Sequence, residues 1–162
     1  MALSLQKHNI PPLYDMGSTR LILGSFPSVK SRQTEFYYSH PQNRFWKVLA
    51  AIYSCPVPDT IERKKNLILS HNLALFDVIA SCDISGSADS KITNVVPNDL
   101  SPILSGSKIT KIYVNGKTAE KYYNKYLRTS TDIECVTLPS TSPANAACSL
   151  EKLIESWKII AE

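Results

Sequence analysis

The segment Arg20-Leu21-Ile22-Leu23-Gly24-Ser25-Phe26-Pro27-Ser28 contains an apolar strand that runs directly into a polar turn. Its first half is almost continuously Leu and Ile, which is typical of a strand buried on both faces of a parallel sheet. Its second half combines glycine, proline and serine, which favour a tight turn. Because ligands of open parallel sheets bind beyond the carboxyl ends of the strands, we expect a binding site at this turn.

Three further apolar runs, at residues 73–78, 109–114 and 134–138, have the length and composition of strands. Segments with the apolar period of a helix lie between the strands, at residues 44–53, 60–71 and 118–127. Strands that alternate with helices in this way indicate an α/β sandwich whose sheet is mainly parallel.

The clearest helix lies near the end of the chain, where apolar residues recur at the spacing of one helix face: Leu150, Leu153, Ile154 and Trp157. Ser142 and Pro143 have the residue types of an N-cap and a first helical position. The pattern therefore predicts a helix that begins near Pro143 and packs one apolar stripe against the sheet.

The chain has 162 residues, of which 43% are hydrophobic, and this is enough for one ordinary core, so we expect a single domain over residues 1–162. A formal net charge of +4 permits a polyanionic partner without requiring one. The early residues are too polar for a signal peptide, and no later apolar run reaches the length of a membrane span. We expect a soluble, cytoplasmic, monomeric protein that makes no membrane contact.

Common cofactor and metal motifs are missing from the sequence. Gly116-Lys117-Thr118 is similar to the end of a phosphate loop, but Lys111 stands where that motif needs a glycine. Gly24 is not followed by the further glycines of a dinucleotide-binding turn. The four cysteines are too far apart for a metal motif, and we expect reduced thiols: Cys55, Cys82, Cys135 and Cys148. The sequence therefore predicts neither a cofactor nor a metal.

Polar motifs follow directly on each of the four predicted strands. They are residues 24–28, Asp77, Asn115-Gly116 and residues 139–142. Because parallel strands end at the same edge of a sheet, these four segments are expected to meet at one rim. Asp77 is the only acidic residue directly at a strand end, and it is interpreted first as a turn or capping residue rather than a catalytic one.

Two asparagines in or near this rim have both a structural and a functional interpretation. Asn43 precedes a predicted helix, and asparagine is a favoured N-cap residue. Asn115 ends a buried strand, where an Asn-Gly pair favours a turn. A carboxamide also offers a donor and an acceptor together, so either residue can match a water or the edge of a nucleobase.

The aromatic and hydroxyl side chains of the rim are equally open to two interpretations. Phe26, Tyr37 and Tyr38 are core residues or platforms on which a base stacks. The run at residues 138–145 is rich in small hydroxyls, which cap a helix or bind a phosphate, and these two roles can coexist.

The segment 24–28 is similar to the first motif of the uracil-DNA glycosylase superfamily, and Leu138-Pro139-Ser140-Thr141-Ser142-Pro143-Ala144-Asn145-Ala146 to its second motif, the loop that probes the duplex. The run Tyr37-Tyr38-Ser39-His40-Pro41-Gln42-Asn43-Arg44-Phe45-Trp46 resembles most closely the hypoxanthine (deoxyinosine) DNA glycosylase branch. The resemblance spans nearly the whole chain. It implies a three-layer αβα sandwich around a four-stranded, mainly parallel sheet.

Two positions differ from the usual pattern of this superfamily. Phe26 stands where most members carry a catalytic Asp or Asn, and Leu138 stands where classical uracil enzymes have a histidine. In the hypoxanthine branch, the residue that matches Asn43 orients the water, and the residue that matches Asn115 recognises the base. The resemblance therefore argues against strong uracil excision and against a histidine cation on the leaving base.

The resemblance implies a monofunctional DNA glycosylase that needs no cofactor and hydrolyses the N-glycosidic bond of a deaminated base in DNA, preferably hypoxanthine. The implied roles are catalysis by Asn43, base binding by Phe26, Tyr38 and Asn115, stabilisation of the leaving group at the turn of Gly24 and Ser25, and DNA binding by Ser140, Ser142 and Asn145. Two alternatives stay open: a mismatch-specific uracil or thymine glycosylase, and a DNA-binding module without catalysis.

Overall fold

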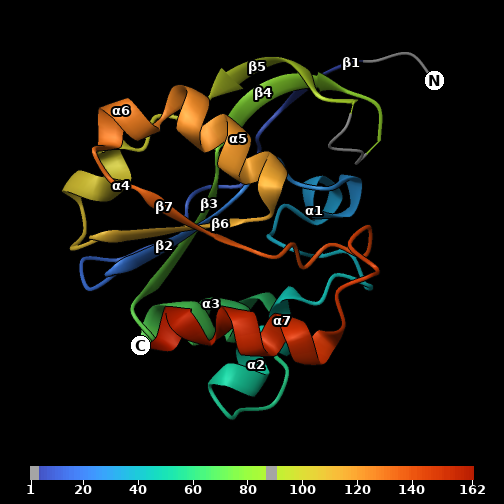
Figure 1. Ribbon diagram of the computed structural model, residues 1–162, viewed down its shortest axis with the longest axis vertical. Helices are drawn as coiled ribbons and strands as arrows, with labels where there is room; N and C mark the ends of the chain where they lie inside the picture. Colours follow the sequence, from blue (N-terminus) through green and yellow to red (C-terminus); the bar gives the residue numbers. More distant parts are fainter. Residues whose placement is uncertain (1–3, 87–90) are drawn as a thin grey trace.

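The computed structural model describes residues 4–86 and 91–162, and its centre is a four-stranded parallel sheet (Figure 1). The strands are β2 (Arg20–Gly24), β3 (Leu73–Asp77), β6 (Lys111–Asn115) and β7 (Cys135–Leu138), in the order β3-β2-β6-β7. All neighbouring pairs in this sheet are parallel. The predicted α/β fold is confirmed, and each predicted strand lies within one or two residues of an observed one.

Helices cover both faces of the sheet (Figure 1). One layer contains α2 (Phe45–Ile52), α3 (Ile61–Ser70) and α7 (Leu150–Trp157). The other contains α4 (Ser101–Ser105), α5 (Lys117–Tyr126) and α6 (Arg128–Thr131). A short helix α1 (Val29–Thr34) follows the turn after β2, and the 3₁₀ turn η2 (Lys158–Ala161) follows α7. This arrangement is the three-layer sandwich that the sequence predicts.

A second, antiparallel sheet of three strands was not predicted. It consists of β1 (Ser4–Lys7), β4 (Ile79–Ile84) and β5 (Thr93–Pro97), in the order β1-β4-β5. The chain passes from β3 into β4 through Val78, whose N–H donates to the carbonyl of Gly24 at 2.8 Å. One extended segment therefore serves two sheets, and the apolar pattern does not reveal the residue at which it changes partners.

The core lies where the parallel strands meet the helices. Leu21, Ile22 and Leu23 have no measurable exposure, as expected for a strand that is covered on both faces. Burial of each such side chain contributes roughly 1.5–3 kcal/mol before the entropy of ordering is subtracted. Trp157 of α7 is also fully buried, meets Phe45 edge to face at 5.8 Å and donates its indole N–H to the carbonyl of Pro139 at 2.9 Å. The last helix is thus tied to the loop that follows β7.

The predicted start of the last helix is wrong. α7 begins at Leu150, and its N-cap is Ser149, whose hydroxyl accepts from the N–H of Lys152 at 3.2 Å. Ser142 instead accepts from the N–H of Ala144, two residues on, and so caps a local turn. A serine followed by a proline is compatible with a helix start and with a turn, which is why the prediction was wrong. The residues between Ser142 and Ser149 form a loop, and this loop borders the site.

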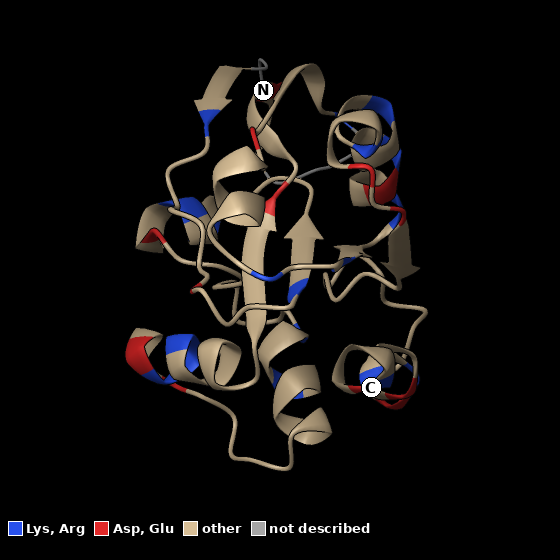
Figure 2. Cartoon of the chain, turned by 90° about the vertical axis from the view of Figure 1, so that its left-hand side faces the viewer, with Lys and Arg blue, Asp and Glu red and all other residues tan. Residues whose placement is uncertain are grey.

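Charges of both signs are interspersed on the helices that are visible from the left-hand side of Figure 1 (Figure 2). Across residues 4–86 and 91–162, no helix combines the length and the apolar character that a membrane crossing requires. The same residues contain no group of three or more His, Cys, Asp or Glu that could hold a metal ion. None of the four cysteines forms a disulfide.

Candidate active site

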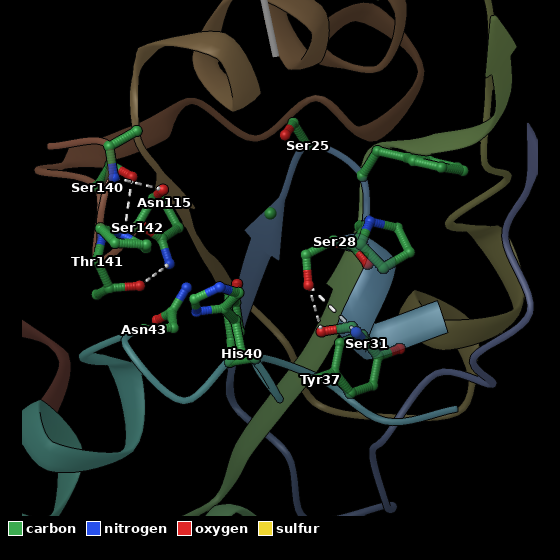
Figure 3. A pocket seen from close by; sticks show the side chains of 17 residues that line it. Ser25, Ser28, Ser31, Tyr37, His40, Asn43, Asn115, Ser140, Thr141 and Ser142 are labelled. Carbon is green, nitrogen blue, oxygen red and sulfur yellow. Dashed lines mark hydrogen bonds between the residues drawn. The ribbon is translucent and has the colours of Figure 1, made fainter. Parts of the chain in front are cut away.

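A cavity of about 300 Å³ lies beyond the carboxyl ends of the parallel strands (Figure 3). Its wall is formed by the last residues of β2, β3 and β6 and by the segments that follow β2 and β7, together with Tyr37, Tyr38, His40 and Asn43. Most of the candidate residues line it: Gly24, Ser25, Phe26, Tyr38, Asn43, Asn115, Ser140 and Ser142. Asn145 does not, and lies instead in a neighbouring hollow on the other side of the loop. The predicted convergence at one rim is therefore observed.

Thr141 makes hydrogen bonds to both the NH₂ group and the oxygen of the Asn115 carboxamide. The Asn115 Nδ2 group donates to Thr141 Oγ1 at 3.0 Å, and the Thr141 N–H donates to Asn115 Oδ1, also at 3.0 Å. These bonds use one N–H and one lone pair, so one of each remains for a ligand. The next residue, Gly116, has φ +95°, and a Cβ there would lie 3.0 Å from the Cβ of Ser140. Glycine lets the two strand ends approach this closely.

Asn43 closes the start of helix α2 and also faces the cavity. Its Oδ1 accepts from the N–H of Phe45 at 2.9 Å, although the N-cap itself is Arg44. Its Nδ2 group makes no hydrogen bond to any residue that the structure describes. Figure 3 shows Asn43 and His40 on the same side of the cavity as Asn115. Asn43 is therefore not the N-cap that was expected, although its Oδ1 does bind the first N–H of the helix, and this contact leaves the amide NH₂ available to a ligand.

Arg44 fastens the loop that follows β7. Its guanidinium donates to the carbonyl oxygens of Ser142 at 3.1 Å, Asn145 at 3.0 Å and Cys148. Its own N–H donates to the carbonyl of Thr141 at 3.1 Å. The sequence does not indicate this role, because an arginine at a helix start is more often exposed. A single side chain thereby joins the segment before α2 to the loop that resembles the DNA-probing motif.

The polar side chains of this loop bind its own backbone. Ser140 Oγ accepts from the N–H of Ser142 at 3.1 Å, and Ser142 Oγ accepts from the N–H of Ala144 at 3.1 Å. The Asn145 amide donates to the carbonyl of Ser140 at 3.0 Å. In each serine the hydroxyl proton is still available as a donor. The loop is thus held in one shape while keeping donors for a strand.

The two candidate stacking rings have different surroundings. Tyr38 lies almost parallel to Phe45, with ring centroids 4.0 Å apart, so only its other face can meet a base. Phe26 is half-buried, with its edge toward His8 at 6.2 Å and the Arg32 guanidinium 5.3 Å from its ring centre. Either ring can still contribute one face to a flat ligand.

Asp77 is neither a turn residue nor a cap. Its Oδ2 lies 2.7 Å from Nε2 of His8, and each of the two side chains is 5% exposed. The N–H of Ile10 donates to His8 Nδ1 at 3.3 Å, so the ring proton belongs on Nε2 and points to the carboxylate. His8 and Asp77 lie far apart in the sequence, and no local pattern announces the pair.

The floor of the cavity has no room for a side chain on Gly24. A Cβ there would lie 2.4 Å from Asp77 Oδ1 and 3.1 Å from the Tyr38 hydroxyl. Burial, and then the negative charge of Asp77, raises the pKa of Tyr38 well above its ordinary value, against a smaller opposing effect of the Asn115 amide. The hydroxyl of Tyr38 therefore stays protonated at neutral pH.

Comparison with known proteins gives a consistent result. Residues 11–161 match the model of the uracil DNA glycosylase superfamily. The chain is 33% identical over 156 residues to a protein of Methanosarcina acetivorans named hypoxanthine DNA glycosylase, with 95% of this chain and 97% of that protein covered. A Methanosarcina barkeri protein of the same name is 30% identical over 120 residues, with 73% and 76% covered.

A solved structure shares the fold as well. It is the solution NMR structure of a Methanosarcina acetivorans protein that is described as a candidate uracil DNA glycosylase. The two chains align with a TM-score of 0.82 and 29% identity over 98% of each. The match to the family model covers nearly all of this chain, and the strand-end cavity lies within it. The chain belongs to the uracil DNA glycosylase superfamily.

Proposed function

We propose that this protein is a monofunctional DNA glycosylase that hydrolyses the N-glycosidic bond of a flipped, deaminated base, preferably hypoxanthine, and leaves an abasic site. The observation that carries the proposal is that Asn43 and Asn115, which come from separate elements, line one cavity of about 300 Å³, which is large enough to hold a single base. The relatives named hypoxanthine DNA glycosylase support the choice of base.

The base has to leave the duplex to reach this cavity. Flipping costs a few kcal/mol and is cheapest for a mispaired base, so a deaminated base has an advantage before any contact is made. Inside, the exposed face of Tyr38 or the ring of Phe26 stacks on the base. Asn115 offers its remaining N–H and lone pair to the edge of the base, in a direction that is fixed by Thr141.

Bond cleavage passes through an oxocarbenium-like sugar while negative charge grows on the departing base. Asn43 is a neutral amide and is too weak a base to take a proton from water, so its role is to orient a water molecule toward the anomeric carbon. Backbone N–H groups at the turn of Gly24 and Ser25 stabilise the leaving base. Donors of this kind contribute roughly 3–4 kcal/mol each.

DNA binding is assigned to the loop of residues 139–149. The hydroxyl groups of Ser140 and Ser142 and the backbone near Asn145 contact the strand on either side of the flipped nucleotide. Because Arg44 holds this loop in place, little order has to be gained on binding. We propose that the protein works as a monomer, with one cavity and one loop acting on one site.

An excision panel tests this function. Purified protein is incubated with synthetic duplexes that carry one hypoxanthine, uracil, xanthine or thymine, and alkali-sensitive strand breaks are counted under single-turnover conditions. Breaks at hypoxanthine above all other bases are expected. Breaks mainly at mispaired uracil or thymine would indicate the mismatch-specific alternative. Binding without any break would indicate a module that has lost catalysis.

A further inference from the structure

The hydroxyl of Tyr38 is the buried polar group that lacks a partner in the cavity. Its oxygen is inaccessible to solvent, and it makes no hydrogen bond of normal geometry to any described residue. Leaving such a group unsatisfied is costly, and native proteins rarely do so without a reason. A ligand atom that accepts a hydrogen bond from this hydroxyl would remove the deficit.

The backbone of Tyr38 is also in a costly conformation. Its φ of +52° lies in the left-handed region, which bulky residues rarely adopt. Strain of this kind is maintained where the surrounding structure enforces it, and it is concentrated at functional sites. Here the ring is clamped on Phe45, with centroids 4.0 Å apart, and the hydroxyl is directed to the cavity floor.

The neighbouring carboxylate of Asp77 is an acceptor with a fixed direction. Its Oδ2 accepts a hydrogen bond from His8 Nε2–H, and its Oδ1 faces Gly24, where an added Cβ would be 2.4 Å away. That same position is 3.1 Å from the Tyr38 hydroxyl. A donor and an acceptor therefore lie close together at the wall of the cavity, and glycine is needed at position 24 because a Cβ there would clash with the carboxylate.

From this arrangement we propose that Tyr38 and Asp77 together bind the lactam group of the flipped base. The Tyr38 hydroxyl donates to the carbonyl oxygen, and Asp77 Oδ1 accepts from the adjacent ring N–H. This inference rests on the proposed glycosylase function and specifies which chemical group is recognised. It also gives Tyr38 a hydrogen-bonding role at the edge of the base in place of the stacking role expected from sequence, and stacking on the face of the base is left to Phe26.

The pair distinguishes a deaminated base from the adenine or cytosine from which it is formed. Hypoxanthine carries N1–H beside C6=O, and uracil carries N3–H beside C4=O, so both present a donor next to an acceptor. Adenine and cytosine present an amino group beside an unprotonated nitrogen, which in the same pose meets the carboxylate as a second acceptor. The pair thus rejects adenine and cytosine. Guanine and thymine carry the same lactam group, so their exclusion depends on the stability of their normal base pairs and on contacts elsewhere in the cavity, and Asn115 remains the residue that separates hypoxanthine from uracil.

Tyr38 also acts during cleavage. When the glycosidic bond breaks, its electrons move onto the base and spread to the carbonyl oxygen, while water adds to the sugar carbon and loses a proton to solvent. The hydrogen bond from Tyr38 becomes stronger as that oxygen becomes negative. The hydroxyl keeps its proton throughout, because burial and Asp77 raise its pKa.

Tyr38→Phe is the first test, because it removes only the hydroxyl and keeps the ring on Phe45. Single-turnover excision of hypoxanthine is expected to fall about 100- to 1000-fold. The Tm is expected to stay equal or rise, because a buried group without a partner is lost. Lower excision with undiminished stability is a combination that a purely structural tyrosine would not give.

Tyr123→Phe is the matched control. The Tyr123 hydroxyl is hydrogen bonded to Thr131 at 2.6 Å and to the carbonyl of Ile133 at 2.5 Å, outside the cavity. This variant should lose stability and keep wild-type excision. Equal excision by Tyr38→Phe and wild type would overturn the proposal, as would a fall in excision with an equal fall in DNA binding and Tm.

Asp77→Asn tests the acceptor. His8 Nε2–H requires an acceptor, so the amide of the variant is expected to turn its oxygen toward His8. Its NH₂ group then faces the cavity, where it places a second donor against the ring N–H of the base. The ratio of hypoxanthine excision to excision of mispaired adenine should fall at least about 100-fold. An unchanged ratio in a folded variant would refute the assignment of Asp77. If the wild-type protein cleaves none of the duplexes, the proposed function itself fails, which is a separate result.

Discussion

Asn115 and Thr141 close a ring of two hydrogen bonds between the end of β6 and the loop that follows β7. The side chain of Asn115 gives one bond to the Thr141 hydroxyl and takes one from the Thr141 N–H, each 3.0 Å long. The carboxamide is thereby fixed in one orientation, with a known donor side and a known acceptor side. A base-reading amide that could flip would not distinguish one base edge from another.

Asn115→Ala is expected to reduce hypoxanthine excision at least about 100-fold, because it removes the proposed base contact and frees the Thr141 backbone. Thr141→Val keeps the backbone bond and removes only the bond to Oγ1, so it should cost about 1 kcal/mol of stability and less than about tenfold in rate. Single-turnover kinetics measure the excision rate of each variant, and urea unfolding measures its stability. Equal losses in the two variants would mean that Asn115 acts only by holding the loop.

Asn43→Ala is expected to lower single-turnover excision about 100-fold or more while DNA affinity stays near that of the wild type. The same change removes the bond to the Phe45 N–H and should cost about 1 kcal/mol of stability. Asn43→Ser restores a capping oxygen without the carboxamide, so it should recover stability but not rate. A serine variant with full excision would leave Asn43 with its capping role alone.

The central sheet could be predicted because buried parallel strands have a distinctive composition. Leu21 to Leu23 are apolar on both faces, and no other element of this length requires that. The second sheet could not be predicted because β4 continues from β3 through Val78. Nothing in the sequence of a continuous extended segment indicates the residue at which it begins to pair with a different sheet. The start of α7 was misplaced because serine and proline serve turns and helix starts equally well.

The candidate site could be predicted only in part, for a similar reason. Asn43 and Asn115 belong to motifs that are local in sequence, and the topology brings them to one cavity. The pair of His8 and Asp77 joins the N-terminal segment to β3, and such a contact depends on the fold as a whole. The use of Arg44 as a clamp likewise depends on three carbonyl groups that only the folded loop presents.

Arg44→Met is expected to destabilise the protein by on the order of 3 kcal/mol, because three backbone carbonyls lose a charged donor at once. Amide hydrogen exchange at residues 141–148 should become faster, and excision should fall as the loop loses its shape. Arg63→Met is the control, since Arg63 is exposed and forms a surface ion pair with Asp59, and it should change stability by less than about 0.5 kcal/mol. Similar effects of the two substitutions would contradict the clamp.

Two adjacent buried tyrosines predict how stability depends on alkaline pH. Burial first, and then the charge of Asp77, raises the pKa of both Tyr37 and Tyr38 well above the ordinary value. In the unfolded chain each ionises near pH 10, whereas in the folded chain each keeps its proton to higher pH. Their contribution is therefore complete below about pH 10 and is lost as pH rises above it.

The free energy of unfolding should accordingly fall by about 1.4 kcal/mol per pH unit for each of these groups above pH 10. Urea unfolding at a series of pH values between about 8 and 11 measures the slope. Tyr38→Phe removes one titrating group and should make the slope shallower by that amount, while Tyr37 keeps its bond to the carbonyl of Pro11 at 2.9 Å. A slope that is the same in both proteins would mean that Tyr38 ionises at the same pH in the folded and the unfolded chain, and that burial does not raise its pKa.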